Sequence, residues 1–155
     1  MAKTVVQSTE VVQYVWWRAA LLGVGLGVIY WALTALLNRY VVSVSVCQGL
    51  STCSDSVAVA GDIATILVAF VGLLLTMAIH VYRPLIVVVA AAVVTWGLGG
   101  WVNGLSWYEA LGWSALLYGL TYILFSWVTQ YQRMITVLVW TIVVVAVARV
   151  IFALV

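Results

Sequence analysis

The chain has 155 residues, of which 67% are hydrophobic and 6% are charged, and its mean hydropathy is +1.25. A soluble domain carries about 25% charged residues and leaves about a third of its chain's surface in water, so this composition excludes a soluble fold. It also excludes intrinsic disorder, because disordered chains are polar and charge-rich. The net charge of +2, from basic residues scattered singly, excludes a nucleic-acid-binding surface. The composition therefore predicts an integral membrane protein.

Hydropathy along the chain predicts five membrane-spanning helices, since each needs about 20 apolar residues to cross the hydrocarbon layer. We expect an all-α, polytopic transmembrane helix bundle that forms a single integral membrane domain over residues 1–155. The first apolar run, residues 19–37, is too long for a signal-peptide core of about 7–15 residues, so we expect it to be retained. The predicted spans cover residues 14–39, 57–81, 84–101, 107–129 and 134–155.

The breaks between the spans have local causes. Pro84 cannot continue a helix but favours the first turn of the next one. A cluster of glycines with Asn103 loosens the chain at the end of the third predicted span. Gln130, Gln132 and Arg133 are too polar for the bilayer centre and indicate the last turn.

The distribution of Lys and Arg predicts the orientation. With the N-terminus inside, four basic residues flank the spans on the inner side and only Arg39 lies on the outer side, so we expect an inside N-terminus and an outside C-terminus. The inner residues are Lys3, Arg18, Arg83 and Arg133.

The segment from residue 40 to residue 60 is the predicted outer loop. Cys47 and Cys53 lie six residues apart in it, and the oxidising side of a membrane favours a structural disulfide that closes this loop. Residues 41–46 alternate in polarity with a period of two, so a short β-hairpin with residues 57–60 is one interpretation. The other interpretation is that both ends continue the flanking helices.

Three charged residues lie in apolar surroundings: Asp62, Glu109 and Arg149. Each is predicted near the outer end of a span, and a charge within the bilayer is costly unless it is paired or faces a cavity. The functional interpretation is a charged site for an ion, proton or substrate that opens to the outside. The structural interpretation is an ion pair between helices, or acids that stabilise helix N-termini.

Small residues form a stripe on the first predicted helix. Gly23 and Gly27 have the spacing that lets two membrane helices approach closely, and we expect them to be helix-packing residues. The stripe either packs inside the bundle or against another copy of the chain. A second pattern, in which residues 57–101 resemble residues 107–155 through Asp62–Gly72 and Glu109–Gly119, is consistent with a duplicated hairpin.

The sequence contains no cluster of residues that predicts catalysis, a metal site or a cofactor. His80 is the only histidine, and metal sites need several ligands together. We therefore predict a non-catalytic subunit or self-assembling component of a membrane complex, with the lipid bilayer and further membrane subunits or identical copies as partners. The compact loops favour a prokaryotic plasma membrane.

Two alternative functions remain open. The first is a small channel or transporter that uses the three charges, with polar lining from Thr65, Asn103, Ser114 and Thr121. The second is a redox enzyme that uses Cys47, Cys53 or His80.

Overall fold

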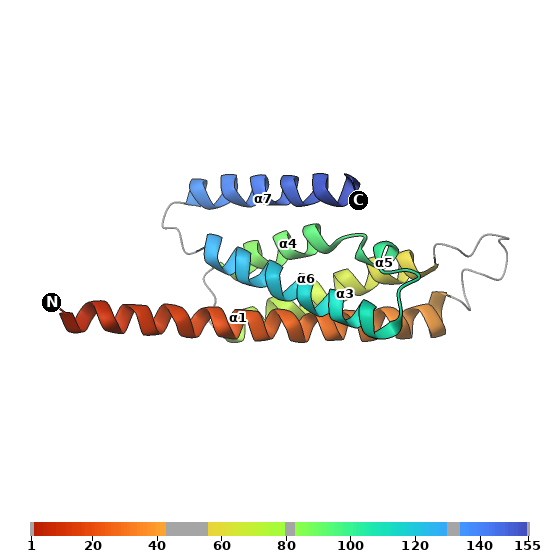
Figure 1. The fold of residues 1–155 in the computed structure, drawn as a ribbon, viewed down its shortest axis with the longest axis horizontal. Coiled ribbons are helices and arrows are strands. Elements are labelled where there is room, and N and C mark those ends of the chain that lie inside the picture. The colour runs from red at the N-terminus through yellow and green to blue at the C-terminus, as the bar shows by residue number, and fades with distance from the viewer. Residues whose placement is uncertain (1, 43–55, 80–82, 130–133, 155) are drawn as a thin grey trace.

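The computed structural model in Figure 1 describes residues 2–42, 56–79, 83–129 and 134–154. All regular structure in these ranges is helical, which confirms the predicted all-α class. The helices are α1 (Ala2–Leu37), the π-helix η1 (Asn38–Val42), α3 (Ser56–Ala78), α4 (Pro84–Thr95), α5 (Leu98–Trp101), α6 (Trp107–Val128) and α7 (Met134–Leu154).

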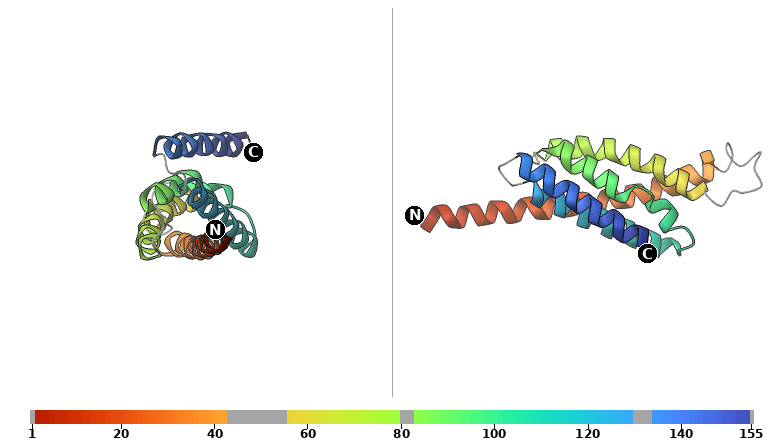
Figure 2. Two further views of the ribbon diagram at one scale, coloured as in Figure 1. Left: turned by 90° about the vertical axis from the view of Figure 1, so that its left-hand side faces the viewer. Right: turned by 90° about the horizontal axis from the view of Figure 1, so that it is seen from above.

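The long helices run alternately in opposite directions (Figure 1). The C-terminal ends of α3 and α6 lie at one end of the bundle, whereas η1, α5 and the start of α6 lie at the other end. We call the second of these the η1 end. The N-terminal part of α1 extends beyond the other helices, so the helix overlaps the bundle only along its C-terminal part (Figures 1 and 2).

Four helical segments are long and apolar enough to cross a membrane: Trp17–Val42, Ser56–Ala78, Pro84–Trp101 and Trp107–Val128. They correspond to the first four predicted spans. In the fifth, the apolar stretch that the structure describes is shorter, Ile135–Ala148. Length and composition thus support a multi-pass membrane protein.

The third predicted span is divided into two helices. It begins at Pro84, as the sequence predicts, but α4 ends at Thr95 because Trp96 is extended and Gly97 has a left-handed backbone with φ 84°. Glycine reaches this conformation at low cost because it has no Cβ. The short α5 then runs in a new direction and crosses α3, where Gly99 and Gly61 come into contact.

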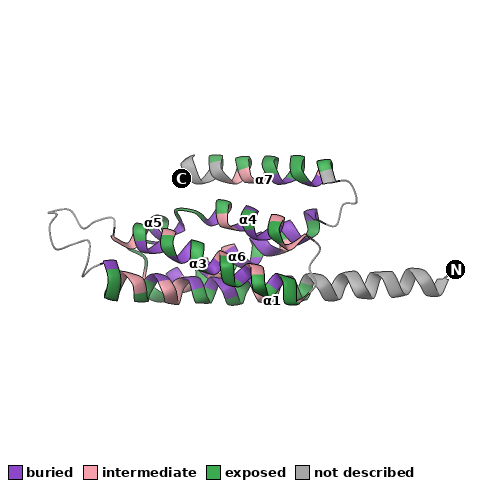
Figure 3. Ribbon diagram, turned by 180° about the vertical axis from the view of Figure 1, so that it is seen from behind, coloured by how far each residue is buried: buried purple, intermediate pink, exposed green. Residues whose placement is uncertain are grey.

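The core of the protein lies between α1, α3, α4 and α6, and Figure 3 shows the buried positions turned toward it. α1 packs mainly on α6 and also on α3, whereas α4 packs on α3 and α6. Large side chains from α1 and α6 fill the centre, among them Leu26, Tyr30, Tyr118, Tyr122 and Phe125.

Helix α7 is packed more loosely than the others. It contacts α4 and α6, and it lies apart from the remaining bundle when viewed end-on (Figure 2, left). An apolar cavity of about 490 Å³ is lined by residues of both α4 and α7. The two halves of the proposed repeat therefore differ, because α4 is built into the core and α7 is peripheral.

The β-hairpin interpretation of the outer loop is wrong for its second strand, since residues 57–60 form the first turns of α3. Val41 and Val42 belong to η1, so both described ends of the loop continue helices. Residues 57–60 are valine and alanine, which a helix in apolar surroundings accommodates as well as a strand does. Cys47 and Cys53, with the predicted disulfide, lie outside the described residues.

Candidate functional site

Four helices contribute hydroxyl groups to one buried region near the η1 end. Tyr30 comes from α1, Thr65 from α3, Thr95 from α4 and Tyr118 from α6, and each is no more than 3% exposed. The rings of Tyr30 and Tyr118 pack with their centroids 5.3 Å apart. Thr65 lies close to both tyrosine hydroxyls, and Thr95 lies close to that of Tyr118. We call these four side chains the hydroxyl cluster.

The hydroxyls of the cluster differ in how they are satisfied. Thr65 donates to the carbonyl oxygen of Gly61 and Thr95 to that of Ala91, both at 2.9 Å. By contrast, Oη of Tyr30 and Oη of Tyr118 are buried and make no hydrogen bond of good geometry to a described residue. Threonine hydroxyls nevertheless interact with both phenols: Thr34 and Thr65 with Tyr30, and Thr65 and Thr95 with Tyr118. Leaving a buried polar atom unsatisfied costs about 1–3 kcal/mol, so the two phenols depend on these threonine hydroxyls or on a bound water.

Asp62 lies beside this cluster. It follows Gly61, the residue at which α3 crosses α5, and its carboxylate interacts electrostatically with Tyr30. One carboxylate oxygen, Oδ1, is buried and has no hydrogen-bond partner in the part of the chain that the structure describes. A carboxylate at this depth in an apolar helix is costly, and it is therefore a candidate functional group.

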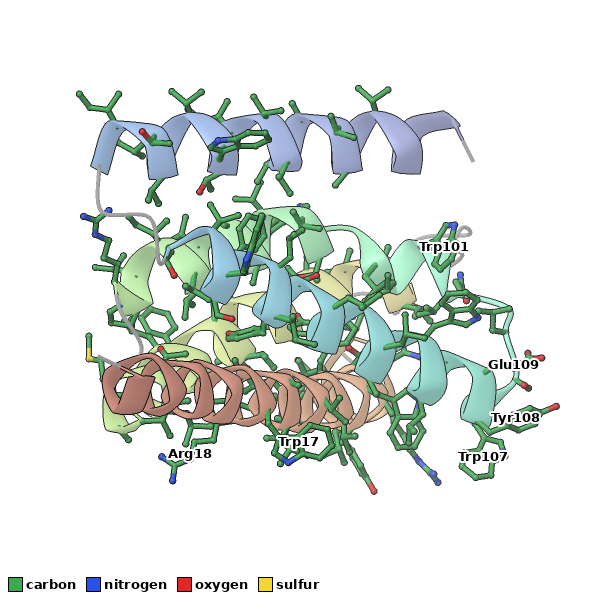
Figure 4. The ribbon with its side chains drawn as sticks, turned by 60° about the vertical axis from the view of Figure 1, so that its left-hand side comes forward. Trp17, Arg18, Trp101, Trp107, Tyr108 and Glu109 are labelled. Carbon is green, nitrogen blue, oxygen red and sulfur yellow. The ribbon has the colours of Figure 1, made fainter. Side chains whose placement is uncertain are left out.

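Glu109 has a different environment. It is exposed at the η1 end, near Trp107 and Tyr108 (Figure 4). Its Oε2 accepts a hydrogen bond of 3.1 Å from the backbone N–H of Ser106, as the glutamate of a capping box does at the start of a helix. This is the helix-start role that one of the sequence interpretations assigned to it.

The three predicted charges are not joined into one cluster by any interaction between described side chains. Asp62 is partly buried beside Tyr30, whereas Glu109 caps α6. Arg149 belongs to α7, and its side chain lies outside the described residues.

A cavity of about 280 Å³ opens at the η1 end and reaches the hydroxyl cluster. We call it the α1–α6 cavity. Tyr30 and Ser114 are buried at its floor, and Asn103, Leu105 and Trp107 are exposed at its mouth. Its full lining consists of Tyr30, Trp31, Thr34, Ala35, Asn38, Val57, Val102, Asn103, Gly104, Leu105, Trp107, Ala110 and Ser114.

The other residues predicted as polar lining fall at separate places. Asn103 and Ser114 line the α1–α6 cavity, whereas Thr121 lines a second cavity of about 390 Å³ beside the break between α4 and α5. Thr65 lines a third, apolar cavity between α3 and α4. The hydroxyls of Ser114 and Thr121 each donate to a carbonyl oxygen one turn earlier in α6.

The structure places Gly23 and Gly27 against α6. A Cβ at Gly23 would lie 2.8 Å from the carbonyl oxygen of Tyr118, and one at Gly27 would lie 2.6 Å from Cα of Ala115. These glycines let the two helix backbones approach closely, so the stripe contacts the protein's own bundle. The close approach also brings Tyr30, one turn further along the same face, against Tyr118.

The described side chains do not form a cluster of possible metal ligands. Among them, no group of three or more His, Cys, Asp or Glu residues lies close enough to share an ion. His80, Cys47 and Cys53 lie outside the described residues.

Sequence reasoning did not single out Tyr30, Thr95 or the α1–α6 cavity. A signal for Tyr30 was present, because Gly23, Gly27, Tyr30 and Thr34 follow the 3.6-residue period along one face of α1. The small-residue spacing of Gly23 and Gly27 by itself predicts only helix packing, whereas Tyr30 and Thr34 continue the same face with polar groups.

No family model, curated protein or solved structure matches this chain.

Proposed function

We propose that the chain is a multi-pass integral membrane protein that acts as a non-catalytic, self-assembling component of a membrane complex, with α7 as its assembly element. The loose packing of α7 is the observation that carries this proposal. Ile135, Ile142 and Val150 are each more than half exposed on α7. The cavity between α7 and α4 is apolar and includes Ala90 and Ala146.

Small residues at such a groove favour the close approach of another helix. A second copy of the chain that inserts a helix here would restore the dispersion contacts that an open groove lacks. The bundle of α1, α3, α4 and α6 would then serve as the scaffold that holds α7.

Native mass spectrometry in a mild detergent tests the assembly. We expect a homo-oligomer for the natural chain and a shift toward monomer for Ala146→Phe, which fills the groove. Leu74→Phe is the matched control, because Leu74 is 69% exposed on α3, a helix that does not line this groove. A monomeric natural chain, or an Ala146→Phe oligomer as stable as that of Leu74→Phe, would contradict the proposal.

The same proposal includes the orientation. The N-terminus is inside and the C-terminus outside, in a prokaryotic plasma membrane, and Cys47 and Cys53 form a disulfide in the outer loop. The alternation of helix directions supports this orientation. It places Arg83 at the end of the bundle where α6 ends and α7 begins, and it places Arg39 in η1 at the opposite end.

The α1–α6 cavity favours a second function, that of a small channel or transporter open to the outside. Of the proposed charged site of Asp62, Glu109 and Arg149, the residue that the structure favours is Asp62, because the cavity reaches Tyr30 beside this carboxylate, whereas Glu109 also has a capping role. Arg149 stays part of the proposal.

Cation flux into proteoliposomes tests this second function. We expect Asp62→Asn to lower Na⁺ or choline flux by about tenfold or more, as removal of about 1.4 kcal/mol of binding would. Asp62→Glu is the matched control, because glutamate keeps the negative charge at this position. Unchanged flux in Asp62→Asn would remove this carboxylate from any pathway.

A further inference from the structure

We infer that the α1–α6 cavity is a binding site for a compact organic ammonium ion. The inference does not depend on assembly through α7, and it concerns binding rather than transport.

Aromatic side chains from two helices line the cavity. Tyr30 and Trp31 come from α1, and Trp107 comes from the first turn of α6. The rings of Trp31 and Trp107 have centroids 6.4 Å apart and planes inclined at 46°, so neither ring is covered by face-to-face stacking on the other. The faces of such rings attract organic cations, and several rings around one space are how proteins recognise alkylated ammonium groups.

The charges around the cavity also favour a cation. Asp62 does not line the cavity, but it follows Gly61, which packs against Oη of Tyr30 at the floor, and its carboxylate interacts electrostatically with Tyr30. Glu109 lies near the mouth, two residues after Trp107. Figure 4 shows Glu109 and Trp107 at the same end of α6. The one basic side chain that the structure describes at this end is Arg39, whose guanidinium lies 6.0 Å from the ring centroid of Tyr40. Neither Arg39 nor Tyr40 lines the cavity.

The size and polar lining of the cavity limit the ligand. Its volume of about 280 Å³ lies just below the ~300–1,000 Å³ of pockets for drug-sized ligands, so a smaller molecule fits. The amide of Asn38 and the hydroxyl oxygen of Thr34 can accept hydrogen bonds from a hydroxyl or N–H on the ligand.

Other ligand classes fit less well. Ca²⁺ takes several oxygen ligands, usually with more than one carboxylate, and Asp62 is the one acid beside the buried floor among the described residues. An anion would be repelled by the carboxylates of Asp62 and Glu109, which lie near the cavity without lining it. A neutral apolar molecule would bind more weakly than a cation of the same shape, because the ring faces and the carboxylates would not attract it electrostatically.

Equilibrium dialysis of labelled choline against the full chain in detergent tests the site. We expect saturable binding that tetramethylammonium displaces. Tetrabutylammonium should fail to compete because it is too large for the cavity. The neutral isostere 3,3-dimethylbutan-1-ol should also compete at least tenfold more weakly, because it has the shape of choline without its charge.

Tryptophan variants distinguish a direct contribution of the aromatic lining to choline binding from a loss of binding caused by a disturbed fold. We expect Trp107→Leu and Trp31→Leu each to weaken choline binding about 3- to 30-fold, the range of a partly to fully desolvated cation–π contact. Trp107 is 68% exposed, so its replacement disturbs the core little. Trp113→Leu is the matched control, because Trp113 lies at the same end, packs on Trp101 at 5.7 Å and does not line the cavity. We expect its affinity to equal that of the natural chain.

Three results would overturn the inference: no saturable choline binding, equal competition by the neutral isostere, or equal loss of affinity in Trp107→Leu and Trp113→Leu. Choline binding by a monomer would refute the proposed assembly and leave this site intact, so the two proposals fail separately.

Discussion

Gly23, Gly25 and Gly27 occupy alternate positions of α1, but only two of them face another helix. Added Cβ atoms at Gly23 and Gly27 would collide with the backbone of α6, whereas a Cβ at Gly25 would have no neighbour within 4 Å. The clashing atoms are carbonyl oxygens and Cα atoms, which cannot move without shifting the whole helix. The α1–α6 contact therefore depends on the absence of two particular methyl groups.

We predict that Gly27→Ala lowers the free energy of unfolding by about 1–3 kcal/mol, the usual cost of forcing extra atoms into a packed contact. Gly25→Ala, which places its methyl group in open space, should change stability little. Thermal unfolding in detergent, followed by intrinsic tryptophan fluorescence, measures both. Equal effects of the two substitutions would show that α1 and α6 do not approach closely at Gly27.

The sequence could predict some of these residues and not others. The spacing of Gly23 and Gly27 indicates a helix-packing face, but the pattern does not say which helix it meets. Asp62 could be selected because a charge in an apolar run is rare. Tyr30 could not, because a tyrosine in a membrane helix is equally consistent with an interfacial position, and only the meeting of four helices makes it part of a polar cluster.

At the scale of elements, the break between α4 and α5 lies earlier in the chain than the local sequence pattern predicts. The glycines from residue 97 onward predict a loose segment at the end of the third span, but the helix already ends at Thr95. The backbone is left-handed at Gly97, and α5 then packs on α3, where Gly99 contacts Gly61. This contact is between residues far apart in the sequence, so a local pattern could not place the break.

We predict that Gly97→Ala destabilises the protein by about 1–2 kcal/mol, because an L-residue pays this cost in the left-handed conformation. A methyl group at this position meets nothing within 4 Å, so the cost comes from the backbone alone. Gly100→Ala is the control: its methyl group would lie 3.6 Å from Cβ of Ala58, an ordinary contact, and its stability should be close to that of the natural chain. Chemical denaturation in detergent compares the two.

At the scale of the whole molecule, hydropathy predicts the long helices well but not how they pack. An apolar helix face can contact either lipid or protein, and these two environments select the same residues. Composition therefore cannot predict that α7 is peripheral and α4 is central, because both helices are rich in valine. Packing is decided by small residues, such as Gly23 and Gly27 of α1, and by buried hydroxyls, such as Thr65 of α3 and Ser114 of α6.

Because the long helices alternate in direction and the two termini point to opposite ends in Figure 1, the proposed orientation makes a definite prediction. Alkaline phosphatase fused after Val155 should be active and a green fluorescent protein fused there should be dark, since the C-terminus is proposed to lie outside. Fusions after Gln130, in the turn before α7, should give the opposite pair of results. If both fusion sites gave the same result, α7 would not cross the membrane, and its place in the assembly would be that of a helix lying along the surface.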